Sequence, residues 1–207
     1  LGDVYKRQLL YRIEFYTALI NKHLGKEEKV QNILASAKKF KINILPIDIN
    51  KSNWNFKIED IQTKSIRAGF SLLKGFGYNA FQEINRVKAE KGEIVSVQDF
   101  LNRGIDWGCL NKKNMKSLVS IGAFDSFNKN RRQVYEIYKE HLENKRGKKS
   151  KHNISQLMLD VFKKELQEKL EEKSLPNVED WEFKEKVKLE KQFLGFNLWT
   201  NLFEPVE

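Results

Sequence analysis

Two glycines that bracket a single apolar residue constrain this chain more than any other feature. Gly75 and Gly77 flank Phe76, an apolar stretch precedes them, and an amphipathic helical pattern follows as far as Ile84. Glycine has no Cβ and adopts positive φ readily, so the chain can turn tightly and another backbone can come close. These residues predict a sharp turn that leads directly into a helix.

The backbone amides of such a turn have a specific chemistry. The turn and the first residues of the next helix leave N–H groups without acceptors in the chain. Together with the positive end of the helix dipole, they form a site that suits a phosphate. We expect Phe76 to point inward and pin the turn, and Lys74 to stand beside it as a phosphate partner. The predicted binding residues are Lys74, Gly75, Phe76, Gly77, Tyr78 and Asn79.

This layout is typical of a helix-hairpin-helix clip for the DNA backbone, but it has a plainer interpretation. Gly-x-Gly occurs in many turns, and a helix C-cap followed by a new N-cap uses the same residues. From this stretch alone, an ordinary corner between two helices stays open beside the DNA-binding interpretation.

The charge of the chain favours an anionic partner. The net charge is +10 and the pI is about 9.5, and nucleic acid is the commonest partner of such a basic protein. Most of the positively charged residues are lysines. The lysine ammonium group acts as a point charge and lacks the fixed donor geometry of arginine, which favours backbone contact over base recognition. Because 32% of the residues are charged, much of this charge is also expected on solvated helix surface.

Several classes of site are not predicted. Cys109 is the only cysteine, so no internal disulfide can form and a reducing compartment fits. His23, His141 and His152 lack metal-ligand spacing, and we predict no metal site. No apolar run reaches the roughly 18 residues of a membrane span, so no membrane partner is expected. The chain starts with Leu, which suggests a fragment, and Leu1–Gln8 fit no helical face, so we do not expect them to be native sequence.

Helical periodicity dominates the remaining sequence, and we predict a mainly α fold, a helical bundle with a helix-hairpin-helix domain and a few short strands. Ser96 with Asp99, Asn111, and Asn79 with Gln82 are predicted N-terminal capping residues. The clearest apolar repeats lie in segments 9–20, 30–40, 134–142, 159–170 and 181–194.

In two short stretches apolar and polar residues alternate, which is typical of β-strands. Ile42–Asn50 alternates around Pro46, which predicts an edge strand because proline cannot complete a hydrogen-bond ladder. Trp54, Phe56 and Ile58 alternate again and can pair locally. Residues 127–151 then hold nine Lys or Arg and three Glu, and we interpret them as a helix followed by a basic linker.

Read in order, five segments resemble one family, the α subunit of bacterial DNA polymerase III, a C-family replicative polymerase. Ile42–Ser52 is similar to the family pattern I-x-(V/I)-L-P-P-D-(I/V)-N-x-S, and the hairpin is similar to I-R-x-G-L-x-x-I-K-G-V-G. The resemblance extends from Leu9 to Phe196. The five segments are Glu14–Asn21, Ile42–Ser52, Ile66–Ile84, Asn111–Asp125 and Trp181–Phe196.

The sequence departs from the family pattern at three places. Ile47 replaces the second proline of the extended stretch, and Tyr78 replaces the acidic residue after the hairpin. Asn197–Phe203 stands where the family has a G-H-P turn, so the C-terminal end is expected to be divergent or not native.

The resemblance implies a division into three regions and a role in DNA replication. Residues 9–60 would be the C-terminal part of the fingers, 61–126 a helix-hairpin-helix DNA-binding domain, and 127–207 a basic linker and helices leading toward the clamp-binding and OB region. The parent protein would be a DNA-directed DNA polymerase of the bacterial cytoplasm. Its partners would be duplex DNA, the sliding clamp and other replisome subunits.

The resemblance places no catalytic residue in this segment. The family's chemistry uses palm aspartates that hold two Mg²⁺ ions, and these lie upstream of every matched position. No cofactor is therefore expected here, and this piece alone should not polymerise. Asp48 and Asp125 lie in matching segments, but as turn and cap residues.

A sliding-clamp peptide is a further implication of the resemblance. A clamp peptide combines a glutamine with aliphatic and aromatic anchors, and Asp160 occupies the aromatic position here, so an ordinary amphipathic helix start fits equally well. The candidate residues are Gln156, Leu157, Leu159 and Phe162.

Two other classes of function stay open at this point. One is a stand-alone helix-hairpin-helix DNA-binding module with no polymerase attached. The other is a basic helical scaffold that binds proteins and not DNA.

Overall fold

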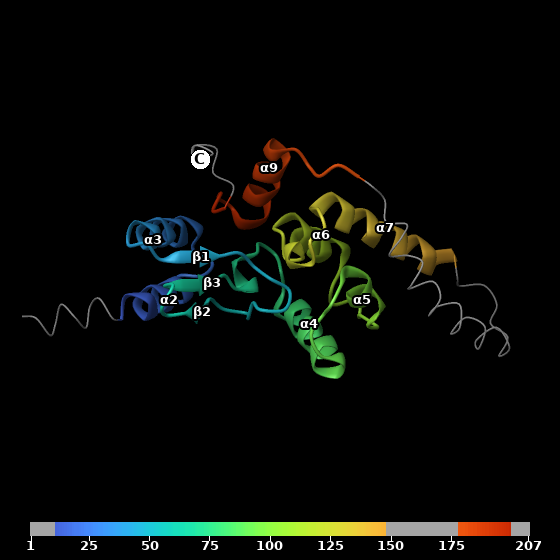
Figure 1. Cartoon of the computed structure of the whole chain (residues 1–207), viewed down its shortest axis with the longest axis horizontal. Coiled ribbons are helices and arrows are strands. Elements are labelled where there is room, and N and C mark those ends of the chain that lie inside the picture. Colours follow the sequence, from blue (N-terminus) through green and yellow to red (C-terminus); the bar gives the residue numbers. More distant parts are fainter. Residues whose placement is uncertain (1–10, 148–177, 200–207) are drawn as a thin grey trace, which may run out of the picture.

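The structure is a computed structural model that describes residues 11–147 and 178–199 (Figure 1). The predicted mainly α fold with a few short strands is confirmed. The helices are α2 (Arg12–Lys22), α3 (Glu27–Lys39), α4 (Tyr78–Lys91), α5 (Val97–Asn102), α6 (Lys112–Ser120), α7 (Arg131–Gly147) and α9 (Phe183–Leu194), with short 3-10 helices η1 (Phe70–Leu72) and η2 (Asp125–Phe127). The strands are β1 (Asn43–Leu45), β2 (Lys57–Asp60) and β3 (Ser65–Arg67).

The strands form one small sheet in the order β1-β3-β2. β1 is parallel to β3, with Ile44 opposite Ile66, and β2 is antiparallel to β3. β1 therefore lies at an edge, as the proline that follows it predicts. β3 is not predicted by the sequence. Only three residues form it, and they belong to the apolar stretch that precedes the hairpin turn. The guanidinium of Arg67 ties this sheet together, donating to the Glu59 carboxylate and to the Pro46 carbonyl oxygen.

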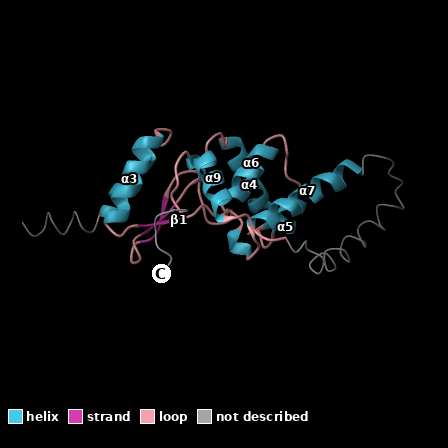
Figure 2. Ribbon diagram, turned by 90° about the horizontal axis from the view of Figure 1, so that it is seen from above, coloured by secondary structure: helices cyan, strands magenta, loops and turns pink. Residues whose placement is uncertain are grey.

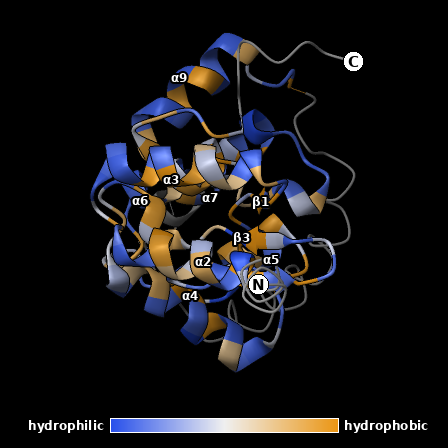
Figure 3. Ribbon diagram, turned by 90° about the vertical axis from the view of Figure 1, so that its left-hand side faces the viewer, coloured by the Kyte–Doolittle hydropathy of each residue, from blue (hydrophilic) through white to orange (hydrophobic). Residues whose placement is uncertain are grey.

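The helices surround the sheet unevenly. In Figure 1, α2, α3 and the sheet occupy one end of the molecule, and α4 to α7 occupy the other. Figure 2 shows the sheet between α3 and the helices of that second group. The hydropathy colouring of Figure 3 places hydrophobic residues toward the interior and hydrophilic residues on the outer helix faces. One continuous core results, with buried residues from Ile13 in α2 to Leu198 after α9.

The extended segment after β1 connects the two ends. The Ile49 amide donates to the Ala123 carbonyl oxygen at 2.9 Å, and the Asn50 side chain bonds both backbone groups of Ile94. Asp48 accepts from the Asn50 and Lys51 amides, which closes a turn. Asp48 is thus a structural turn residue, as the sequence suggested.

Most predicted helix ends are confirmed. The Ser96 hydroxyl accepts from the Asp99 amide at 3.0 Å, and the Asn111 side-chain oxygen accepts from the Asn114 amide at 3.0 Å. The predicted capping by Asn79 is wrong. α4 begins one residue earlier, at Tyr78, and its N-cap is Gly77, which has no side chain to offer.

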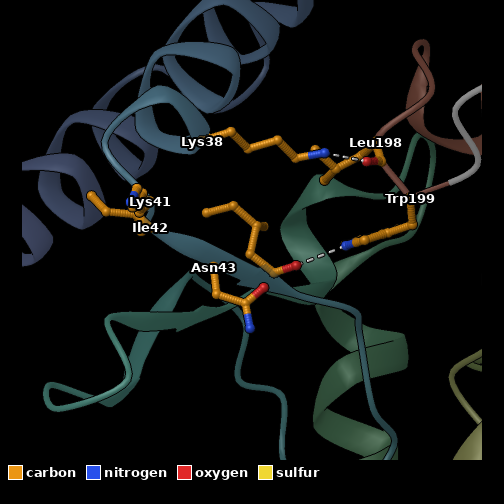
Figure 4. A pocket seen from close by; sticks show the side chains of 7 residues that line it. Lys38, Lys41, Ile42, Asn43, Leu198 and Trp199 are labelled. Carbon is orange, nitrogen blue, oxygen red and sulfur yellow. Dashed lines mark hydrogen bonds between the residues drawn. The ribbon is translucent and has the colours of Figure 1, made fainter. Parts of the chain in front are cut away.

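The described chain ends against α3 and β1. The Glu190 carboxylate, in α9, accepts from the Leu198 and Trp199 amides. The Lys38 ammonium donates to the Leu198 carbonyl oxygen, and the Trp199 indole donates to the Ile44 carbonyl oxygen (Figure 4). These contacts border a cavity of about 390 Å³, lined by Lys38, Lys41, Ile42, Asn43, Ile44, Leu198 and Trp199. Lys38 and Trp199 at its border are already used in hydrogen bonds to backbone carbonyl oxygens.

Candidate nucleic-acid interface

A tight turn between η1 and α4 forms the candidate site. Gly75 has φ of +70°, in the left-handed region that a side chain disfavours, and this bends the chain away from η1. Gly77 has extended geometry, with φ of −80° and ψ of 152°, and serves as the N-cap of α4. Only a single 3-10 turn, following β3, precedes the hairpin, so the first helix of this motif is much shorter than its second.

Several amides of the turn have no acceptor among the residues that the structure describes. The hydrogen bonds of the described chain give none to Gly75 or Gly77, and both residues are exposed. Tyr78 and Asn79 occupy the first turn of α4, where N–H groups have no intrahelical acceptor, and they are exposed as well. The amides of Phe76 and Lys74 are used internally, by the Leu73 and Phe193 carbonyl oxygens. An accessible set of donors therefore begins at Gly75 and continues into α4.

Phe76 anchors the turn from below, as expected. Its side chain is only 6% exposed and stacks on Phe70 of η1, with ring centroids 5.6 Å apart and an interplanar angle of 21°. Phe81 of α4 also packs on Phe70. Phe70 therefore links the aromatic ring between the glycines to α4, while the glycine backbone stays at the surface.

Lys74 is not a free cation in this structure. Its ammonium group lies 2.7 Å from a carboxylate oxygen of Glu27, at the start of α3. Its amide donates to the Phe193 carbonyl oxygen at 2.8 Å, near the end of α9. Gly195 packs so closely that a Cβ there would overlap both Glu27 and Lys74. The Lys74 charge predicted to face a phosphate is thus balanced by a carboxylate.

A different lysine lies beside the turn. The ammonium nitrogen of Lys113, in α6, is 3.1 Å from the position that a Cβ of Gly75 would occupy. Lys113 is exposed and forms no salt bridge within residues 11–147 and 178–199. Sequence reasoning missed it, because the cap at Asn111 already explained the residues that follow. The available signal was the pair of lysines in a first helical turn without acidic residues.

Tyr78 adds an aromatic surface next to the exposed amides. Its side chain is half exposed and contacts Trp54 edge-on, with ring centroids 5.1 Å apart. Asn79 lies beside it in the same helical turn. Both predicted residues therefore lie at the surface of the turn, with the glycines.

The turn that follows α6, around Gly122, is closed by internal hydrogen bonds. After α6, the Gly122 amide donates to Val119 and the Ala123 amide donates to Leu118. Asp125 pairs with Arg131 at 2.8 Å, and a Cβ at Gly122 would overlap both side chains. The amides of this turn are therefore used for folding, and Asp125 has a structural role.

The remaining predicted sites have no counterpart that can be described. Gln156, Leu157, Leu159 and Phe162, the candidate clamp peptide, lie outside the described residues. Within the described ranges, no group of three or more His, Cys, Asp or Glu is placed to hold a metal ion. No helix there has the length and apolarity needed to cross a membrane.

The turn, its buried aromatic anchor and the helix that follows have the layout of a helix-hairpin-helix motif. The family described as the helix-hairpin-helix motif matches residues 41–134. Over about half of its length, this chain is similar to proteins named DNA polymerase III subunit alpha.

Three of those relatives show the extent of the similarity. The DNA polymerase III subunit alpha of Helicobacter pylori is 29% identical over 115 residues, 53% of this chain and 9% of the relative. That of Staphylococcus epidermidis is 30% identical over 105 residues, 51% of this chain and 10% of the relative. That of Thermus aquaticus is 32% identical over 109 residues, 53% of this chain and 9% of the relative. The chain thus spans about a tenth of the length of the curated relatives that it matches.

Proposed function

We propose that this segment holds the backbone of duplex DNA, without sequence preference, as part of a replicative DNA polymerase. A phosphate would be bound by the amides that begin at Gly75 and continue through Gly77 into the first turn of α4. The observation that carries this proposal is the exposed turn, where two glycine amides have no acceptor within residues 11–147 and 178–199 and a 14-residue helix directs its positive end outward.

The charge of the surrounding surface supports backbone binding. The first turns of α4 and α6 contain no acidic residue, and the whole chain has a net charge of +10. Lysine charges near a phosphate chain add attraction that depends on salt and not on base sequence. A protein that moves along every sequence during replication needs contacts of this type.

The activity of the parent protein is a proposal as well. The relatives are named as DNA polymerase III subunits alpha, and we propose template-directed DNA synthesis for the complete protein to which this segment belongs. The Mg²⁺ ions of that chemistry would be bound outside this sequence, and binding of the sliding clamp stays a proposal. The described residues are assigned DNA contact and no catalytic step.

The test adds a side chain where the phosphate would lie. A Cβ at Gly77 meets no atom within 4 Å, and its φ suits any residue, so Gly77→Val should fold. Duplex binding is measured by fluorescence anisotropy with two unrelated 20-base-pair duplexes. We expect about tenfold weaker binding to both, which corresponds to the loss of one charge-assisted hydrogen bond.

A matched control is available in the loop between β2 and β3. Gln62 is exposed and uncharged, so Gln62→Val adds the same surface valine away from the turn and should bind as the parent does. Unchanged duplex affinity in well-folded Gly77→Val overturns the proposal. Binding that is insensitive to salt in the parent chain would instead favour a protein-interaction scaffold.

A further inference from the structure

We propose that Lys113, on α6, supplies the cation that pairs with the phosphate at the Gly75–Gly77 turn, in the place that sequence reasoning gave to Lys74. This inference rests on the proposed DNA-backbone function and names the charged partner of that site. Its basis is a juxtaposition that the fold creates, because α6 begins far along the chain from the turn.

The geometry places the ammonium group against the open side of the glycine. The Lys113 nitrogen is 3.1 Å from the position of a Gly75 Cβ, and its Cε atom is 3.7 Å from that position. The lysine end thus occupies the space that a side chain at residue 75 would fill. An anion bound to the Gly75 amide would therefore have a positive charge next to it.

The charge balance of the two lysines separates their roles. Lys74 has its carboxylate, Glu27, at 2.7 Å, whereas Lys113 has no acidic partner in the part of the chain that the structure describes. A lysine that keeps its full charge beside unpaired N–H donors favours an anion more strongly than a lysine that is already paired. Among the lysines adjacent to the turn, Lys113 is the one placed to attract a phosphate.

The identity of residue 75 is explained by the same contact. A positive φ alone favours glycine, but asparagine also adopts such geometry. The closeness of Lys113 adds a second reason, because a Cβ at residue 75 would push the ammonium group back by a few tenths of an ångström. The glycine therefore keeps both the amide and the lysine available to one anion.

The test compares two neighbouring lysines in the full chain. Lys113→Gln and Lys112→Gln remove one charge each from the same exposed helix start, and Lys113→Arg retains the charge. Binding of a 20-base-pair duplex is titrated by anisotropy between 50 and 300 mM NaCl. We expect Lys113→Gln to bind about fivefold to tenfold more weakly at low salt, with the slope of log K against log salt smaller by about one. Lys112→Gln should lose less than about twofold, and Lys113→Arg should stay close to the parent.

Combining variants separates this inference from the proposed function. If Gly77→Val loses affinity while Lys113→Gln binds as the parent does, the amide site stands and the role of Lys113 is overturned. Equal losses in Lys113→Gln and Lys112→Gln also overturn it, since general charge then explains both. If Gly77→Val binds normally, the proposed function fails, and this inference fails with it. In the supporting case, Lys113→Gln has little further effect in the Gly77→Val background, because both act on one phosphate.

Discussion

Glu27 and Lys74 form a 2.7 Å ion pair that joins the start of α3 to the residue before the hairpin turn. Gly195, which follows α9, packs closely against the pair, and the Lys74 amide donates to the last turn of that helix. Three segments that are distant in sequence thus meet at one corner. The corner fixes the turn, and it also places a carboxylate close to the proposed phosphate site.

Glu27→Gln should therefore strengthen DNA binding. Removing the carboxylate frees the Lys74 charge, and we expect about two- to threefold tighter duplex binding at low salt, fading as salt screens the charges. Both side chains are about half exposed, so the free energy of unfolding should change by less than about 1 kcal/mol. Glu28→Gln is the control, because Glu28 is exposed on the same helical turn and forms no ion pair in the described ranges. Equal gains in the two variants would contradict a specific role for Glu27.

The two glycines should respond differently to alanine. Gly75 has a positive φ and Lys113 beside it, so Gly75→Ala should lower the free energy of unfolding by about 1–2 kcal/mol. Gly77 has ordinary geometry and open space at its Cβ. Alanine is a poorer N-cap than glycine but lowers the entropy of the unfolded chain, so Gly77→Ala should change stability by less than about 0.5 kcal/mol. Urea denaturation of both variants measures this difference. Similar losses of stability in the two variants would contradict the difference in backbone geometry between Gly75 and Gly77.

Phe76 should be important for folding and not for direct DNA contact. It is 6% exposed and stacked on Phe70, so Phe76→Ala should cost about 3–5 kcal/mol of stability. Phe76→Leu keeps most of the buried volume and should cost about 1–1.5 kcal/mol. Thermal and urea unfolding give the two values. The prediction fails if Phe76→Leu, while still folded, loses DNA affinity as strongly as Gly77→Val does.

Acid should destabilise the fold partly through Glu83. Hydrogen bonds from Arg86, with a further one from the Asp106 amide, lower the pKa of Glu83 below its ordinary 4.5, although burial opposes this. A lowered pKa in the folded state means that stability is complete above about pH 4.5 and declines as pH falls through the folded pKa. Glu83→Gln should cost about 1.5–3 kcal/mol at pH 7.

The measurement is urea unfolding between pH 3 and pH 7 for the parent and for Glu83→Gln. The variant should lose less stability than the parent between pH 4.5 and pH 3, because it no longer has this carboxylate to protonate. Parallel curves of stability against pH for the two proteins would show that protonation of Glu83 does not contribute to the loss of stability in acid.

Much of the fold was readable from local patterns. Helical spacing predicted α2, α3 and α9, the caps Ser96 and Asn111 located α5 and α6, and Pro46 placed β1 at an edge. These features depend on backbone preference and on which face of an element is apolar, and a sequence shows both directly. The turn around Phe76 was readable for the same reason. β3 was missed because three buried residues give no alternating pattern. The start of α4 was misplaced because Asn79 is a residue type that often caps helices, but it lies inside the first turn and Gly77 is the N-cap.

The sequence by itself determined that a tight glycine turn, pinned by an aromatic ring, would precede a helix in a basic, mainly α chain. Only the tertiary structure decided which donors and charges remain available there. Glu27 neutralises Lys74, Phe193 takes its amide, and Lys113 reaches Gly75 from another helix. The physical reason is that hydrogen bonds and ion pairs between distant segments depend on how helices pack. Local periodicity and capping signals contain no information about that packing.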